Sequence, residues 1–195
     1  AGALTTWTSL NFTDPEAGNE GTYSPSNPFP TNTPNADINY AIRATGQLVV
    51  TVAGEYHLGY QGDDGGYMVI NGPGNPFFKS IVFTNHPTIS KLREEVLGGT
   101  GRNNMVTTET ASPSSRTIVN VDLQPGTYTI RTLMFQSTGN SFWEVFGSQN
   151  PGSTSFVYPL LTSDGPSTIA VPGGLTLAAQ TVTPVSTPFT ITGFT

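Results

Sequence analysis

The chain has 195 residues, a length typical of one domain, and only 10% of them are Asp, Glu, Lys or Arg, against roughly 25% in an average soluble domain. Its formal net charge of -6 argues against a nucleic-acid-binding protein, because such proteins carry a basic surface. There is no cysteine, which excludes disulfides and thiol chemistry, and no run approaches the ~20 apolar residues of a transmembrane helix, so no membrane insertion is expected.

Strand patterns dominate the chain, which 22 glycines and 16 prolines interrupt often. An apolar patch of Trp7, Leu10 and Phe12 comes first, and residues 24–35 hold four prolines, which predicts an extended surface loop. Apolar and β-branched runs then predict strands at 38–52 (with a break at Thr45–Gly46), 54–62, 66–72, 76–83, 116–123, 126–137 and 141–147.

Residues 54–62 show the clearest alternation. Tyr56, Leu58 and Tyr60 fall on one face, and the residues between them, including His57, fall on the other. This period of two predicts a strand that is buried on one face only. We expect no metal or catalytic role for His57 or His86, because neither has a partner at a recognisable spacing.

One segment, 89–99, has helical spacing. Ile89, Leu92 and Val96 repeat every three or four residues, Gly98 could end a helix, and Glu94–Glu95 would form its solvated face. A loop is the alternative, and residues 98–115 are predicted to be a long polar connection. With ten or more short strands in total, the predicted fold class is all-β, an antiparallel β-sandwich with at most one or two short helices.

Two neighbouring carboxylates, Asp63 and Asp64, precede Gly65 and Gly66. Asp-Gly is a favoured pair in type I′ hairpin turns, so a plain turn is one interpretation. A Ca²⁺ site is the other, because this ion prefers six to eight oxygen ligands with carboxylates among them. Consecutive side chains of an ordinary strand point to opposite faces, so the two aspartates could share an ion only on an unusual backbone, such as a cis peptide.

Two longer motifs follow each other in a fixed order. Residues 53–72 read "AGEYHLGYQGDDGGYMVING", in which an alternating strand leads through Asp-Asp-Gly to an apolar strand and an Asn-Gly turn. Residues 123–146 read "LQPGTYTIRTLMFQSTGNSFWEVF", in which a Pro-Gly turn, an alternating strand, a short loop and a closing strand follow each other. With the strand pattern "INYAIRATGQLVV" before them, residues about 38 to 147 resemble the PA14 domain, a β-sandwich module of bacterial toxins, glycosidases and microbial adhesins.

The resemblance implies a jelly-roll-like sandwich and, from the adhesin branch of that family, a calcium site. There the adjacent aspartates are joined by a cis peptide and bind Ca²⁺ with an Asn side chain and loop carbonyls, and two sugar hydroxyls complete the shell. Carried over, Asp63 and Asp64 form the pair, and the loop is "QSTGNS", residues 136–141. The family's Asn position falls near Ser137 and the nearest asparagine is Asn140, so this chain departs from the pattern and both residues are candidate metal ligands.

Candidate ligand-binding residues are Asp63, Asp64, Tyr67, Asn140 and Trp143. An exposed aromatic ring near the aspartates would stack on a sugar, whereas a buried one would supply packing area. Both interpretations stay open for Trp143. Tyr60 and Tyr67 are rival candidates for the ring that stacks on a sugar. Asn140 could instead be a turn residue after Gly139. No catalytic motif is present, so we expect a protein that is not an enzyme.

Three regions are expected. Residues 1–37 form an N-terminal strand and Pro-rich loop of the sandwich, residues 38–147 the PA14-like core, and residues 148–195 a C-terminal β extension. The extension is rich in Val, Thr, Leu and Ile from Thr168 onwards, interrupted by Pro172 and Pro184. It either packs on its own core or is donated to the open sheet edge of a neighbouring copy.

The expected function is a calcium-dependent carbohydrate-binding module of an extracellular adhesin, with calcium as cofactor and a glycan as partner. The alternative is a structural subunit of an extracellular filament or surface assembly, in which copies join by β-strand addition and any calcium stabilises them. The Thr-, Ser-, Gly- and Pro-rich composition with only two lysines favours an extracellular or cell-surface location, with Ala1 as the residue that follows a removed signal peptide.

Overall fold

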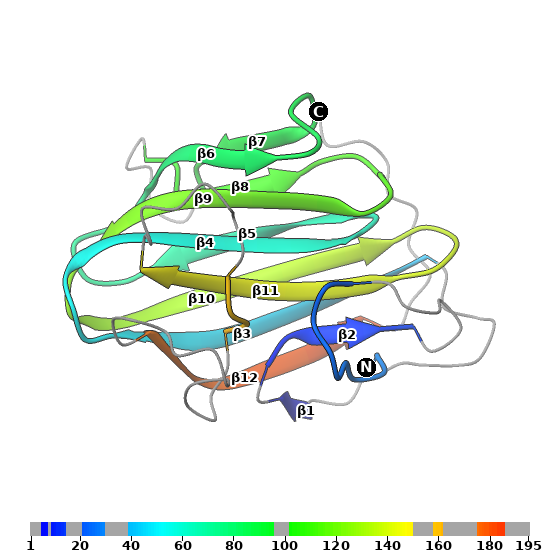
Figure 1. Ribbon diagram of the computed structural model, residues 1–195, viewed down its shortest axis with the longest axis horizontal. Helices are drawn as coiled ribbons and strands as arrows, with labels where there is room; N and C mark the ends of the chain where they lie inside the picture. Colours follow the sequence, from blue (N-terminus) through cyan, green and yellow to red (C-terminus); the bar gives the residue numbers. More distant parts are fainter. Residues whose placement is uncertain are drawn as a thin grey trace.

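Two antiparallel sheets pack face to face in the part of the chain that the structure, a computed structural model, describes: residues 5–7, 9–14, 21–29, 39–95, 102–149, 158–161 and 175–185 (Figure 1). One sheet has the strand order β1 (Thr5–Trp7), β12 (Leu175–Val185), β3 (Tyr40–Val50), β10 (Gly126–Gln136), β5 (Gly65–Asn71), β8 (Met105–Thr108) and β7 (Ser90–Arg93). The other has the order β2 (Asn11–Thr13), β11 (Phe142–Gln149), β4 (Gly54–Asp63), β9 (Ser115–Leu123) and β6 (Phe78–Thr84).

The predicted all-β antiparallel sandwich is confirmed, and the described residues contain no helix. Accordingly, none of them forms a helix with the length and hydropathy of a membrane span. β3 continues through Thr45 and Gly46 without the predicted break, because both residues pair with β10 on one side and β12 on the other.

The helix prediction for 89–99 is wrong over Ser90–Arg93, which form β7, while residues 96–99 lie outside the described part. Ser90 and Leu92 pair with Thr108 and Val106 of β8. Ser90 is buried and Leu92 packs against the core, so the buried positions are spaced by two rather than by three or four. β8 itself lies in the stretch that was predicted to be a polar connection.

Trp143 lies in the main core, at one end of the sandwich. Its ring stacks on Tyr60 at a centroid distance of 5.0 Å and is 2% exposed. A Cβ atom added to Gly62 would come within 2.4 Å of this ring, and one added to Gly66 within 2.8 Å of the ring and 2.0 Å of the Leu133 carbonyl oxygen. The glycines on either side of the two aspartates therefore make room for Trp143.

The five-stranded sheet is covered on its outer face as well. Phe146 and Ile118 lie there in a small apolar cluster with Tyr158, whose hydroxyl lies 2.6 Å from Nδ1 of His57. β4 is therefore buried on both faces along most of its length, which corrects the prediction of a strand that is buried on one face only.

A buried carboxylate holds the N-terminal segment against this outer face. Glu144 on β11 is fully buried and accepts hydrogen bonds from the backbone N–H groups of Thr22 at 2.8 Å and Tyr23 at 2.9 Å. The side-chain amide of Gln61 donates to the same carboxylate. These donors replace the water that burial removes, although burial still raises the pKa of Glu144.

The two end regions of the chain contribute to the sandwich. Leu10, Phe12 and Phe29 lie in the main core. β12 pairs with β3 of the same chain, and β1 pairs with β12. Residues 175–185 thus form a strand of the seven-stranded sheet beside β3, while residues 162–174 and 186–195 lie outside the described part.

Gly66→Ala is expected to lower the free energy of unfolding by about 2 kcal/mol, because inserting a methyl group into a close-packed site costs about 1–3 kcal/mol and a backbone carbonyl oxygen stands only 2.0 Å away. Gly126→Ala is the matched control, since its Cβ would come no closer than 3.2 Å to the Pro73 ring. Urea denaturation followed by tryptophan fluorescence measures both variants. Equal losses in the two would contradict the close contact at Gly66.

The free energy of unfolding is expected to fall as the pH drops through 6.5 towards the lower pKa of folded His57. Burial lowers that pKa, with Glu55 acting in the opposite direction, so the unfolded chain takes up the proton first. Above pH 6.5 this contribution is fully present. Glu144, with its raised pKa, produces the opposite slope as the pH rises above 4.5.

Comparison with His57→Gln isolates the histidine, because Glu144 is common to both proteins. Urea titrations at several pH values between about 8 and 5 should give a flatter profile for the variant. Identical profiles would show that His57 is not the source of the slope.

Candidate functional site

Asp63 and Asp64 lie where the chain crosses from one sheet to the other. β4 ends at Asp63 in the five-stranded sheet and β5 begins at Gly65 in the seven-stranded sheet. The hairpin-turn interpretation is therefore wrong, because hairpin strands are neighbours in one sheet, and neither Asp64 nor Gly65 has the positive φ of a type I′ turn. The Asp63–Asp64 peptide bond is cis, as the resemblance implied.

A second crossover, from β10 to β11, lies beside the first, at the right of Figure 1. We call Asp63, Asp64 and the loop 137–140 the tip. Asp64 joins the two crossovers: its carboxylate accepts a hydrogen bond from the Ser137 N–H, and its own N–H donates to the Phe135 carbonyl at 3.1 Å.

Asp64 is almost entirely buried, with 8% of its surface exposed, and its carbonyl oxygen accepts from the Ser112 N–H at 3.0 Å. Asp63 is half-buried and pairs with Phe142 of β11. Asp64 is thus held through its carboxylate, its N–H and its carbonyl group, and Asp63 is the more exposed of the two residues.

Gln136 organises the tip loop from inside. Its side-chain amide donates to the carbonyl oxygens of Thr138 at 3.0 Å, Gly139 at 3.2 Å and Asn140 at 3.0 Å. The Gln136 side chain is fully buried, so these three carbonyl groups turn inward and converge on one nitrogen. No sequence pattern predicts this role of Gln136, because a polar side chain at the end of a strand predicts nothing about the loop beyond it.

The two candidates for the third metal ligand differ in their surroundings. Ser137 is held by both backbone groups, since its N–H donates to Asp64 and its carbonyl accepts from the Asn39 N–H at 3.0 Å. Asn140 is exposed and follows Gly139, which has a φ of 88°. The structure thus brings Ser137 against Asp64, and it places Asn140 on the solvent side of the loop, in a position that also suits a turn residue.

The aromatic candidates do not gather at the solvent side of the tip. Trp143 is 2% exposed and Tyr60 is fully buried, so neither ring offers a face to a sugar, and the packing interpretation of Trp143 holds. Tyr67 is half-buried and lines a pocket on the outer face of the seven-stranded sheet. It is the one ring of the three that a ligand can reach in this arrangement.

The chemistry of the tip suits a hard cation. Its oxygen atoms include two carboxylates and the side-chain amide of Asn140, and Ca²⁺ takes mixed sets of charged and neutral oxygens. No group of three or more His, Cys, Asp or Glu that could hold a metal occurs within the described ranges. An ion at the tip would therefore use two acidic ligands and complete its shell with neutral oxygens.

Comparisons of the chain with protein-family models, curated proteins and solved structures found no match. Membership of the PA14 family thus stays a prediction, which rests on the motifs within residues 38–147.

Proposed function

We propose that the chain is a calcium-dependent carbohydrate-binding module of an extracellular adhesin, related to PA14 domains, and that the tip is its binding site. One observation carries the proposal: the Asp64 carboxylate ties the β4–β5 crossover to the loop between β10 and β11 through the Ser137 N–H. Two adjacent acidic residues and a loop rich in oxygen donors thereby belong to one unit at the end of a rigid sandwich.

Each tip residue has a distinct part in this function. Asp63 and Asp64 supply the negative charge, the exposed Asn140 side chain supplies a neutral oxygen, and Gln136 keeps the loop in shape. A bound Ca²⁺ ion would supply open coordination positions, which two hydroxyl groups of a sugar fill in place of water. Ser137, held by Asp64 and Asn39, fixes the distance between the aspartates and the loop.

The charge of the chain supports a cation and a neutral sugar. With 13 acidic against 7 basic residues, the molecule attracts cations and repels anionic ligands. A neutral glycan that meets a bound cation avoids this repulsion, so we expect neutral sugars to be preferred over sulfated or sialylated ones.

Calcium binding is expected with a dissociation constant of about 10⁻⁴ to 10⁻³ M, the range of extracellular modules, and Asp63→Asn should weaken it about tenfold or more. Asp122→Asn is the matched control and should leave calcium affinity unchanged. Asp122 lies on β9 opposite Glu55, near the start of β4 and therefore at the other end of that strand from Asp63, and its side chain is 62% exposed. Isothermal titration calorimetry measures both variants. Equal losses of affinity in the two would contradict a calcium site at the tip.

A glycan array then tests recognition, with calcium and with EDTA. Binding to neutral glycans in calcium, lost in EDTA and in Asp63→Asn, is the expected pattern. Binding that survives EDTA unchanged, or no binding to any glycan, would contradict the proposed function even if calcium binds.

The position of β12 favours a second candidate function, a subunit of an extracellular filament or surface assembly. β12 lies between β3 and β1, and residues 162–174 separate it from Leu161 in the sequence. A strand inserted in a sheet and joined through a long connection can equally be supplied by a neighbouring copy without changing the fold. In that case β12 of each copy would join the sheet of the next copy and so link the copies into a filament.

Paired cysteine variants distinguish exchange from internal pairing, because the native chain has no cysteine. Thr45 has Thr181 of β12 as its partner on one side and Arg131 of β10 on the other. If copies exchange β12, mixing Thr45→Cys with Thr181→Cys should give a disulfide-linked dimer on a non-reducing gel. Mixing Thr45→Cys with Arg131→Cys is the control and should give none.

A disulfide that forms only when Thr45→Cys and Thr181→Cys are combined in one chain, and only within a monomer, would rule out exchange.

A further inference from the structure

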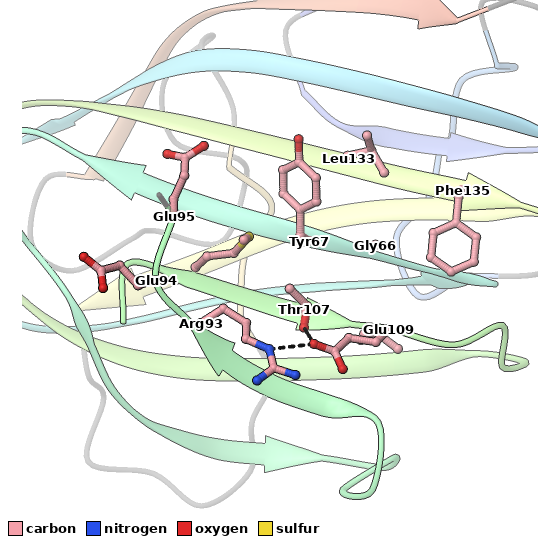
Figure 2. A pocket seen from close by; sticks show the side chains of 11 residues that line it. Gly66, Tyr67, Arg93, Glu94, Glu95, Thr107, Glu109, Leu133 and Phe135 are labelled. Carbon is pink, nitrogen blue, oxygen red and sulfur yellow. Dashed lines mark hydrogen bonds and ion pairs between the residues drawn. The ribbon is translucent and has the colours of Figure 1, made fainter. Parts of the chain in front are cut away.

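A pocket of about 450 Å³ opens on the outer face of the seven-stranded sheet, away from the core (Figure 2). Side chains from four neighbouring strands line it: Tyr67 of β5, Leu133 and Phe135 of β10, Met105 of β8 and Arg93 of β7. Its volume lies within the ~300–1,000 Å³ of ligand sites in proteins. Neither the tip nor its proposed calcium chemistry accounts for this pocket.

Apolar side chains form one wall of the pocket, on the face where a sheet ordinarily carries polar residues. Tyr67 and Leu133 are direct partners on β5 and β10, and Phe135 lies beside them, as Figure 2 shows. Their neighbours Met68 and Met134 are fully buried in the core, so the wall residues point to the opposite face. Tyr67 and Leu133 are only half-buried, so a ligand in the pocket can contact their carbon atoms.

The charges of the pocket and its surroundings balance one another. Three glutamates line the pocket, and four of the seven basic residues of the chain lie on the same sheet face or at its edge: Glu94, Glu95 and Glu109 against Arg43, Lys91, Arg93 and Arg131. Glu109 is paired with Arg93 at 2.7 Å, and Glu95 is paired with Arg131. A charged ligand in the pocket would lose hydration and would compete with these ion pairs, so an uncharged ligand is favoured.

The pair of Arg93 and Glu109 offers a donor and an acceptor side by side (Figure 2). Arg93 donates from Nε to Oε1 of Glu109, and the Thr107 hydroxyl donates to the same oxygen at 3.1 Å. The Nη groups of Arg93 and Oε2 of Glu109 have no hydrogen-bond partner among the described residues. Two neighbouring hydroxyl groups complement this arrangement, because each hydroxyl both donates and accepts.

We propose that the pocket is a second, metal-independent ligand site, which binds a neutral hexopyranose with its ring against Tyr67 and Leu133 and two neighbouring hydroxyl groups on Arg93 and Glu109. The C–H face of such a ring packs on aromatic and aliphatic carbons, while its hydroxyl groups lie at its edge. Burial raises the pKa of Tyr67, so its hydroxyl stays protonated and can also bind the sugar. The site goes beyond the proposed function, because it uses no metal ion and lies on the sheet face rather than at the tip.

Phe135 makes a separation of the two sites necessary in any test. Its side chain lines the pocket and lies against Gly65, where an added Cβ would come within 2.8 Å of the ring, while its carbonyl oxygen accepts from the Asp64 N–H. A sugar bound at the tip would therefore disturb signals near the pocket. Chelation separates the sites, because only the tip is proposed to need calcium.

The test is an NMR titration of the ¹⁵N-labelled full chain, in EDTA, with methyl β-glucopyranoside, glucosamine, glucuronic acid and cyclohexanol. Saturable shifts of the Tyr67, Thr107 and Glu109 amides are expected with the glucoside. Glucosamine and glucuronic acid test the preference for a neutral ligand. Cyclohexanol keeps an apolar ring but lacks the second hydroxyl group. Each of these three should bind about fivefold more weakly or worse, the effect of one lost hydrogen bond.

Arg93→Gln removes the donor beside Glu109 and leaves that carboxylate without its ion-pair partner. The side chain of Arg93 is 51% exposed, so the variant is expected to fold. Its affinity for the glucoside should fall about fivefold or more, and its preference for the glucoside over glucosamine should narrow. Arg102→Gln is the matched control and should change neither, because Arg102 lies outside the pocket and donates to the Asn75 carbonyl at 3.1 Å.

Met105→Trp gives an independent measure, because the larger ring fills the pocket and should abolish the shifts with the glucoside. Val52→Trp adds the same ring at a site that is 46% exposed and should leave them unchanged. Four results would overturn the proposal: no saturable shift with the glucoside, equal affinity for cyclohexanol, equal losses in Arg93→Gln and Arg102→Gln, or shifts that appear only when calcium replaces EDTA. The last result would assign the sugar to the tip and support the proposed function instead.

Discussion

The packing of Trp143 between two glycines is the constraint on which the arrangement of the tip depends. The ring belongs to β11 in one sheet, and it contacts Gly62 before the crossover and Gly66 after it, in the other sheet. Because the ring fills the space where two Cβ atoms would stand, the crossover can approach the core only as closely as the ring and the missing side chains of these glycines allow. The aspartates between these glycines are therefore positioned by an apolar contact.

The hydrogen bonds of the tip extend this positioning to the loop. Asp64 is joined to Ser137, Ser137 to Asn39, and the Ser141 carbonyl oxygen accepts from the Asp14 N–H at 2.8 Å. The ends of β2, β3, β4 and β10 thus meet through backbone hydrogen bonds and through the one buried carboxylate of Asp64. Selective binding of a small ligand requires that the groups of a site are held to within about 0.5 Å, and such supporting hydrogen bonds contribute to that.

Strands were predicted well where apolar residues alternate with others over a long stretch, as in residues 54–62 and 126–137. β7 was missed since four residues are too few to separate a period of two from helical spacing. The second buried face of β4 was missed because its cover, Tyr158, lies 101 residues beyond His57 in the sequence. No local pattern contains such a contact.

The residues of the site were likewise predicted from local sequence, whereas their arrangement was not. The two aspartates stood out because of their charge in a chain that has little of it. Whether they formed a hairpin or a crossover depended on which sheet each flanking strand joins, and that pairing is not written in the residues nearby. The place of Trp143 in the core and the pocket beside Tyr67 likewise depend on strands far apart in the sequence.

Gln136 has a consequence for the energetics of recognition. Its side-chain amide donates hydrogen bonds to three loop carbonyl groups, so the loop is ordered before a ligand binds. A preorganised receptor loses little conformational entropy on association, and its affinity is not reduced by the need to order a segment. The association rate of a ligand would then depend on diffusion and on the displacement of water, and not on a rearrangement of the loop.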